Sequence, residues 1–171
     1  IKPPELVPPS FRLRGPEFLI IYHDTFKMAA ETLARWKNMR GLRTETVSIG
    51  SVGNSVNQIK TYIRNRREGL SRLRYVLLFG DVDMIKSELV TGGPWGDNIT
   101  DYYYSTASDP SGPTDLVMPW LAIGRIPVRT AAEGMGVVNQ IISYERNPPT
   151  AADYYERMAF AAYFQDTDWN S

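Results

Sequence analysis

Cysteine is absent from this sequence of 171 residues, and histidine occurs only once, as His23. A chain without cysteine can form no disulfide, no thiolate metal site and no cysteine nucleophile of its own. The carboxylates are therefore the first groups to consider for any chemistry in this chain.

Excess charge and long hydrophobic runs are absent as well. The 19 basic residues balance the 19 acidic ones, so no global charge draws the chain to nucleic acid or to an anionic membrane. No apolar run approaches the roughly 20 residues that a membrane-spanning helix needs, and nothing at the start resembles a signal peptide. The first residue is Ile1 rather than methionine, so we expect that a preceding segment has been removed.

The arrangement of apolar residues predicts a regular series of strands and helices after a short arm. Residues 1–16 contain five prolines and predict an extended arm with neither a helix nor an interior strand. Strands are expected at 18–22, 44–49, within 74–85, at 119–123 and at 158–163. Helices are expected at about 24–40, 55–67 and 130–144. Residues 86–117 show no clear period and predict a long loop, which in a compact domain is usually functional or disordered.

Alternating strands and helices with apolar strands predict an α/β fold, in which a mainly parallel sheet has helices on both faces. Ligands of such sheets lie at the carboxyl ends of the strands. The stretch "RYVLLFGDVDMI" delivers Asp81 and Asp83 to that edge. Other aspartates follow further strands or lie in the long loop: Asp24, Asp101, Asp109, Asp115 and Asp166. The edge is therefore predicted to be acidic although the chain as a whole is neutral.

Several kinds of site are disfavoured by the residues. No G-x-G-x-x-G or Walker spacing follows a strand, which argues against a nucleotide site. A receiver-type phosphoacceptor needs an acidic pair after the first strand and a lysine after the last, and that lysine is missing. His23 could act as a base, but no serine stands in a nucleophile-elbow context, and a lone histidine at a strand end is more often structural. The tyrosines 102–104 have no basic patch beside them, which argues against nucleic-acid binding.

A calcium site remains open at this stage. Hard cations take several oxygen ligands, and a loop rich in glycine, proline and aspartate supplies them at irregular spacing. The aspartates Asp101, Asp109 and Asp115 suit that chemistry, but no EF-hand spacing is present. The same residues equally suit ordinary turn positions, and the residues alone leave both interpretations open.

The order of the segments adds a resemblance to a known family. The pieces "EFLIIYHDTFKMAAETLARWKNMRGLRTETVSI", "YVLLFGDVD", "DYYYST" and "LAIGRIPVRTAAE" follow one another as in the gingipain-like cysteine peptidases. The sequence resembles that family from about residue 17 onward. The resemblance implies a caspase-like catalytic domain of two similar α/β subdomains. Residues 17–171 then form the amino-terminal subdomain, and the second subdomain is absent from this chain.

The resemblance assigns no catalytic residue to this chain, because the histidine and cysteine of the family's dyad lie in the second subdomain. His23 matches a common family histidine that is not the catalytic one. Family members bind calcium, which implies Asp81 as a ligand together with Asp109 and Asp115. The resemblance also makes two residues near the subdomain boundary candidates for another ion site, Asp166 and Asp168. The chain departs from the family at Trp120, where an acidic residue is common.

The function implied by the resemblance is that of the amino-terminal part of a secreted or surface-exposed cysteine endopeptidase. Its Cys/His dyad would come from a missing carboxy-terminal half, so this chain alone should be inactive. That half and peptide substrates are the expected partners, with neither nucleic acid nor a membrane span. Calcium is a candidate cofactor that the chemistry itself does not require. The alternative is a non-catalytic scaffold or interaction domain of the same fold. We expect the chain to be either a processing product or a truncated piece.

Overall fold

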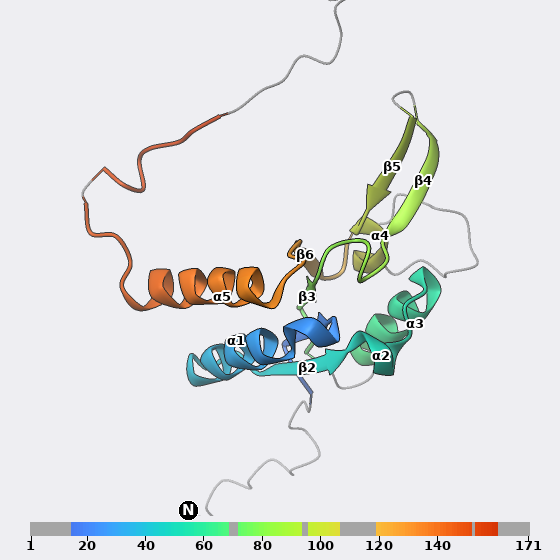
Figure 1. Ribbon diagram of the computed structural model, residues 1–171, viewed down its shortest axis with the longest axis horizontal. Helices are drawn as coiled ribbons and strands as arrows, with labels where there is room; N and C mark the ends of the chain where they lie inside the picture. The colour runs from blue at the N-terminus through green and yellow to red at the C-terminus, as the bar shows by residue number, and fades with distance from the viewer. Residues whose placement is uncertain (1–14, 69–71, 94–95, 107–118, 152, 161–171) are drawn as a thin grey trace, which may run out of the picture.

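The computed structural model describes residues 15–68, 72–93, 96–106, 119–151 and 153–160. The strands are β1 (Phe18–Tyr22), β2 (Thr44–Ser48), β3 (Tyr75–Phe79), β4 (Glu88–Gly93), β5 (Gly96–Thr100) and β6 (Ala122–Ile126). The helices are η2 (Asp24–Phe26), α1 (Lys27–Met39), α2 (Ile49–Val52), α3 (Val56–Arg67), α4 (Tyr102–Ser105) and α5 (Ala131–Arg146). Four strands form one sheet in the order β2-β1-β3-β6, and β4 and β5 form a separate hairpin (Figure 1).

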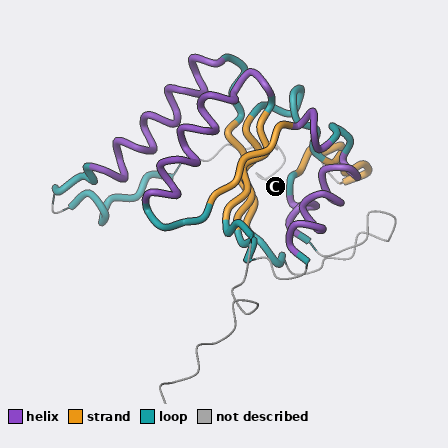
Figure 2. Tube along the Cα trace, turned by 90° about the horizontal axis from the view of Figure 1, so that it is seen from below, coloured by secondary structure: helices purple, strands orange, loops and turns teal. Residues whose placement is uncertain are grey.

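All neighbouring strands of the four-stranded sheet are parallel, and β1 lies in the middle with β2 and β3 on its two sides. Because side chains alternate along a strand, β1 feeds two separate cores. Leu19 and Ile21 point to the face covered by α2, α3 and α4, whereas Ile20 and Tyr22 point to the face covered by α1 and α5. Figure 2 shows the sheet between these two layers. The predicted α/β fold class is confirmed.

The predicted helix boundaries follow from local capping. The side chain of Ser55 accepts a hydrogen bond from the backbone of Gln58 and starts α3 with a capping box. Thr130 and Glu133 start α5 in the same way, as the sequence predicted. After α1 the chain turns at Gly41, whose φ of +87° suits glycine.

Two predictions between β3 and α5 are wrong. The described part of 86–117 is not an irregular loop: it holds β4, β5 and α4. The hairpin strands are largely exposed and polar, so they lack the apolar alternation that identifies a half-buried strand. The strand expected at 119–123 instead spans Ala122–Ile126. Trp120 lies before it and donates its backbone N–H to the carbonyl of Ser105 (3.0 Å), so the paired region starts later than the apolar run does.

The predicted strand at 158–163 is not found in its described part. Residues 158–160 have no strand pairing, and Met158 and Phe160 are 78% and 86% exposed; residues 161–163 lie outside the described part. The arm at 1–16 likewise lies outside it, except for residues 15 and 16. In the described part of the chain, no helix is long and apolar enough to span a membrane.

The crossover connections between the parallel strands share one hand. The connection from β1 to β2 runs over the face of α1, and the connection from β2 to β3 runs over the opposite face in the opposite direction. Both connections have the same hand, and parallel crossovers are right-handed in about 98% of cases. α5 packs beside α1 on the same face of the sheet. β6 is the last strand of the sheet, and no described strand pairs with its outer edge.

Candidate functional site at the carboxyl edge of the sheet

The carboxyl ends of the four parallel strands gather polar side chains at one edge of the sheet. His23 and Asp24 follow β1, Asp81 follows β3, and Arg129 lies three residues beyond β6. This is the edge at which open α/β sheets bind their ligands. The sequence predicted the carboxylates of this edge, but it did not reveal their partners.

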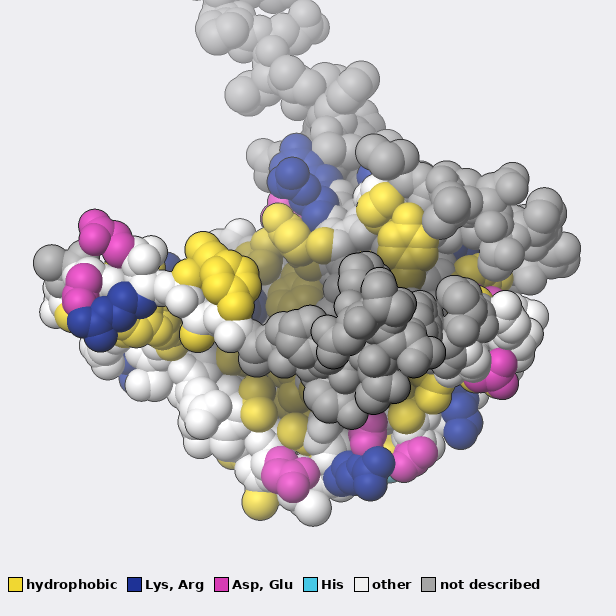
Figure 3. All heavy atoms as spheres, turned by 90° about the horizontal axis from the view of Figure 1, so that it is seen from above, with side chains coloured by type: hydrophobic (Ala, Val, Ile, Leu, Met, Phe, Trp, Pro, Cys, Tyr) yellow, Lys and Arg dark blue, Asp and Glu magenta, His cyan; other side chains and the backbone are white. Residues whose placement is uncertain are grey.

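The two aspartates of the "GDVD" turn share one arginine. Arg129 donates through Nε to Asp81 (2.5 Å) and through Nη2 to Asp83 (3.2 Å). The hydrogen bond from Arg129, followed by that from the backbone of Val82, holds the pKa of Asp81 below its usual value. The guanidinium group therefore offsets the repulsion between the two carboxylates. Figure 3 shows that acidic and basic side chains lie next to one another on one face of the molecule.

His23 and Asp24 have local structural contacts. His23 is the N-cap of η2, and its Nδ1 accepts a hydrogen bond from the backbone of Thr25 (3.4 Å). Asp24 accepts a hydrogen bond from the hydroxyl of Ser48 at the end of β2 (2.5 Å). These contacts agree with the structural interpretation of His23 and tie the ends of β1 and β2 together.

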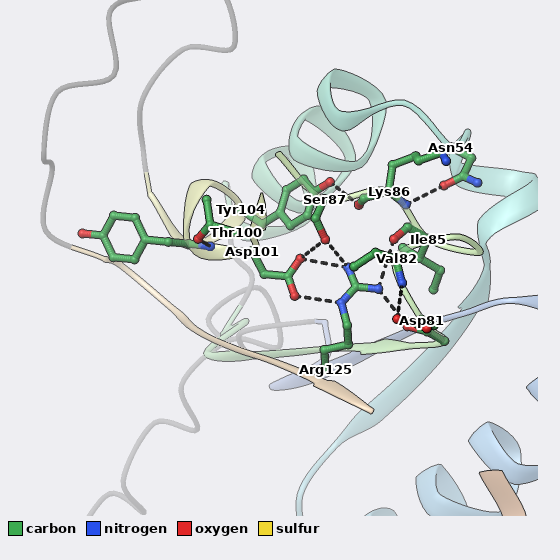
Figure 4. Close-up of polar contacts among 12 residues, drawn as sticks. Asn54, Asp81, Val82, Ile85, Lys86, Ser87, Thr100, Asp101, Tyr104 and Arg125 are labelled. Atoms are coloured by element: carbon green, nitrogen blue, oxygen red, sulfur yellow. Dashed lines mark hydrogen bonds and ion pairs between the residues drawn. The ribbon is translucent and has the colours of Figure 1, made fainter. Parts of the chain in front are cut away.

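A buried arginine organises the segment after β3. Arg125 on β6 is only 10% exposed at its side chain and donates from two nitrogens to the carboxylate of Asp101 (2.8 Å each). It also donates to Ser87 Oγ (2.8 Å) and to the carbonyls of Gly80 (2.7 Å) and Ile85 (3.0 Å). We call Arg125, Asp101 and Ser87 the Arg125 cluster (Figure 4). It joins β6, the turn after β3 and the start of α4.

Burial alone would raise the pKa of Asp101, but hydrogen bonds from Arg125 and Ser87 outweigh it and lower the pKa below its usual value. Asp101 is therefore an ionised partner of Arg125 at neutral pH. The same turn is held from a second side. The side-chain amide of Asn54 donates to the carbonyl of Met84 (2.9 Å) and accepts from the backbone of Lys86 (3.0 Å). The backbone that presents Asp81 is therefore fixed by contacts from several elements.

Of the metal ligands that the resemblance implies, only Asp81 lies among the described residues. Asp109, Asp115, Asp166 and Asp168 lie outside the described residues. Asp81 is described, and its carboxylate is bound to Arg129. Calcium takes about six to eight oxygen ligands, and among the described residues no group of three or more histidines, aspartates or glutamates is placed to hold a metal ion. The described residues do not form a calcium site by themselves, so calcium binding stays a prediction.

Neither arginine of this edge was predicted from the sequence. Arg125 lies inside the stretch "LAIGRIPVR", where a charged residue within an apolar run is a signal, because a buried charge needs a partner. Arg129 follows the same strand. Because β3 and β6 are parallel neighbours, the residues that follow them lie at the same edge of the sheet. The sequence did not show which aspartate each arginine would contact, since the pairs are 24 and 48 residues apart.

The edge has no catalytic dyad in the described part of the chain. The sequence has no cysteine, and His23 is used as a helix cap. The carboxylates of the described edge are bound by arginine, by a hydroxyl or by backbone groups. This arrangement supports and positions loops; it does not supply a nucleophile.

Comparisons with known proteins identify the family. The model of peptidase family C25 matches residues 12–170. None of the curated proteins matches the chain. The dimeric latent PorU from Porphyromonas gingivalis has a similar fold, with a TM-score of 0.64 and 20% identity, over 77% of this chain and 16% of that one. The complex of the RgpB pro- and mature domains from the same organism has a TM-score of 0.61 and 25% identity, over 75% of this chain and 29% of that one.

The Arg-specific cysteine proteinase gingipain R (RgpB) gives a TM-score of 0.61 and 23% identity, over 81% of this chain and 30% of that one. The chain thus spans between 16% and 30% of these solved chains. The family model covers nearly the whole sequence, and the solved structures have the same caspase-like α/β fold. The chain therefore belongs to peptidase family C25, the gingipain family of cysteine peptidases.

Proposed function

We propose that this chain is the amino-terminal subdomain of a cysteine endopeptidase whose catalytic cysteine and histidine are supplied by a carboxy-terminal half outside the chain. The observation that carries the proposal is a peptidase-family match over residues 12–170 in a sequence without cysteine. A cysteine peptidase cannot act without its thiolate, so the nucleophile has to come from another part of the protein. The small share of the solved chains that this chain covers agrees with that arrangement.

The outer edge of β6 is the surface that we assign to the missing half. An apolar hollow of about 420 Å³ lies over the adjoining face of the sheet, between α1 and α5, and residues of β6 such as Ala122 and Gly124 form part of its lining. β6 is the last strand of the four-stranded sheet, and no described strand pairs with its outer edge. A second α/β subdomain packed here would bury the exposed apolar surface.

In the complete enzyme the thiolate would attack the peptide carbonyl, and the histidine would protonate the leaving amine. Water would then hydrolyse the acyl-enzyme. The residues of this chain would act on that chemistry indirectly. The Arg125 cluster and the Asp81–Arg129 pair hold the loops at the carboxyl edge, which is the edge where a cleft shared with a second subdomain would form.

Secretion and calcium binding belong to the same proposal. Both follow from the resemblance to gingipain-like peptidases. A calcium ion near Asp81 would have to compete with Arg129 for the carboxylate, and its remaining ligands would come from other residues. A secreted peptidase without cysteines in this half would gain rigidity from such an ion instead of from disulfides.

The test is labelling of the complete protein, produced from its full gene and separated under denaturing conditions, with a thiol-directed peptidyl probe. We expect the label on a polypeptide region outside this sequence, together with cleavage of peptide substrates. Replacement of the labelled cysteine by alanine should abolish both signals. A protein that takes up no label and cleaves no peptide would overturn the proposal and would favour the scaffold alternative.

A paired substitution tests the assigned interface. Ala122→Glu places a charge at an exposed position of β6 that lines the apolar hollow, and it should separate the two halves or lower activity strongly. Met28→Glu changes an exposed side chain on α1 (73% exposed) and should leave both unchanged. Equal behaviour of the two variants would show that the β6 edge is not the interface.

A further inference from the structure

A cluster of arginines lies at the opposite, amino-terminal edge of the sheet, away from the Asp81 edge. Arg67 ends α3, and Arg72 and Arg74 lie just before β3. These three side chains line one hollow of about 330 Å³ together with Glu17, which precedes β1, and the buried Leu73. We call this hollow the arginine pocket.

The positive charge of the arginine pocket is not balanced by the described residues. Its three arginines face one carboxylate, that of Glu17, which leaves two positive charges. Glu17 is itself 3.8 Å from Nε of a fourth arginine, Arg43. Arg72 and Arg74 form no ion pair with another described residue. Like charges held together in this way repel one another unless an anion binds between them.

One of the three arginines is held in place by packing. The guanidinium of Arg67 lies 5.8 Å from the ring centroid of Trp120, a cation–π distance. Its Nε is buried and has no hydrogen-bond partner within the described residues. Packing on Trp120 therefore fixes the orientation of the Arg67 guanidinium at the wall of the hollow.

Compensation of the α3 dipole explains only part of the cluster. Cations near a helix C-terminus are stabilised by the macrodipole within about the last turn, which accounts for Arg67 and for its helix neighbours Arg64 and Arg66. Arg72 and Arg74 lie on the segment that leads into β3, outside the helix. Both side chains are exposed, so they are accessible to a ligand in the hollow.

We propose that the arginine pocket binds a doubly charged oxyanion of the phosphate or sulfate type. Guanidinium groups donate paired hydrogen bonds that match such oxygens, and a dianion would neutralise the two uncompensated positive charges. The pocket lies at the edge of the sheet remote from the proposed catalytic cleft, so its ligand is not the peptide substrate. The proposal does not depend on peptidase activity.

The test is isothermal titration calorimetry of the complete protein with sodium phosphate, sodium sulfate and O-phosphoserine at constant ionic strength. We expect saturable binding that falls at least about tenfold in the double variant Arg72→Gln/Arg74→Gln, because two charge-assisted contacts are lost. Arg35→Gln removes the same charge from an exposed position on α1 and should bind like the wild type. Tighter binding of O-phosphoserine than of phosphate would assign the pocket to phosphate esters, and the reverse order to free ions.

A charge-preserving variant separates a specific pocket from general attraction. Arg72→Lys/Arg74→Lys keeps both charges but cannot form paired hydrogen bonds, so it should bind more weakly than the wild type. Equal affinities for the wild type and this variant would reduce the pocket to nonspecific charge attraction and overturn the proposal. Absence of saturable binding in the wild type, or equal loss in Arg35→Gln, would do the same. Circular dichroism of each variant confirms that it is folded.

Discussion

Arg125 on β6 and Asp101 at the start of α4 form a bidentate ion pair, with both nitrogen–oxygen distances at 2.8 Å. The side chains are 10% and 21% exposed. Since the same guanidinium also binds two backbone carbonyls of the turn after β3, the pair connects β6, β3 and α4. The stability of this turn depends on a charge that is removed from water.

The isosteric substitution Asp101→Asn should destabilise the chain by about 3 to 5 kcal/mol, because it leaves Arg125 buried without a counter-charge. The exposed pair between Arg66 and Glu45 has a similar distance of 2.7 Å, and Glu45→Gln should cost less than about 1 kcal/mol. Urea unfolding of both variants measures the difference. Similar losses of unfolding free energy in the two variants would mean that burial does not increase the cost of breaking the Arg125–Asp101 pair.

The same variant has a distinct pH signature. The pKa of Asp101 is lowered in the folded chain, so its contribution is present above the unfolded pKa and is lost as the pH falls through the folded one. We expect acid destabilisation below about pH 4 to be weaker in Asp101→Asn than in the wild type. Unfolding curves at a series of acidic pH values check this, and Glu45→Gln serves as the control.

Lys60 is a second buried charge, on α3, with a side chain that is almost fully enclosed (residue exposure 1%). Its Nζ donates to the carbonyls of Tyr103 and Thr106 and to the hydroxyl of Thr106 (2.9 Å). Desolvation lowers the pKa of Lys60 to about 8, although the charge of Glu88 opposes the shift. The contacts join α3 to the end of α4.

A lowered lysine pKa makes the folded state bind its proton less tightly than the unfolded state does. Stability should therefore rise with pH between about 8 and the unfolded value of about 10.5. Relative to Lys60→Met, the wild type should gain about 1 to 2 kcal/mol across this window, after allowance for solvent screening. Lys27→Met alters an exposed lysine and should leave the slope unchanged. A flat difference between wild type and Lys60→Met would contradict the buried charge.

Calcium binding at the Asp81 edge can be tested through Arg129. If Asp81 is a ligand, Arg129→Gln removes a competing cation and should raise the affinity for calcium, whereas Asp81→Asn should lower it. Thermal unfolding of the complete protein with calcium, and with magnesium as the control ion, measures both effects. Calcium-induced shifts that are identical in the wild type and both variants would remove Asp81 from the set of predicted ligands.

The sequence predicted the elements whose evidence is local. The apolar strands β1 and β3 and the capping boxes of α3 and α5 depend on neighbours in the chain, and they lie where the patterns indicated. The hairpin of β4 and β5 depends on cross-strand pairs such as Leu89 with Ile99. Both side chains of that pair are more than half exposed, so no core-facing period marks them.

The partners of the carboxyl edge were hidden for a similar reason. Asp81 was identified because it follows a buried strand, but its partner Arg129 is 48 residues away in the sequence, in the segment after β6. The burial of Lys60 within a basic helix also gave no signal, because the sequence around it resembles a solvated face. Which side chains pair across the fold depends on the order of the strands in the sheet. The local patterns of a single sequence do not indicate that order.

Two glycines of α5 provide a matched test of its packing on the sheet. A side-chain carbon at Gly134 would lie 3.0 Å from Phe26 and 3.4 Å from Phe79, whose rings are stacked, whereas one at Gly136 would meet nothing within 4 Å. Gly136→Ala should stabilise the chain by about 0.5 to 1 kcal/mol, because alanine favours the helix. Gly134→Leu should instead destabilise it by about 1 to 3 kcal/mol or more, because the added carbons overpack the core. Thermal unfolding of both variants decides the matter. If Gly134→Leu were as stable as Gly136→Ala, the close approach of α5 to the Phe26–Phe79 stack would be wrong.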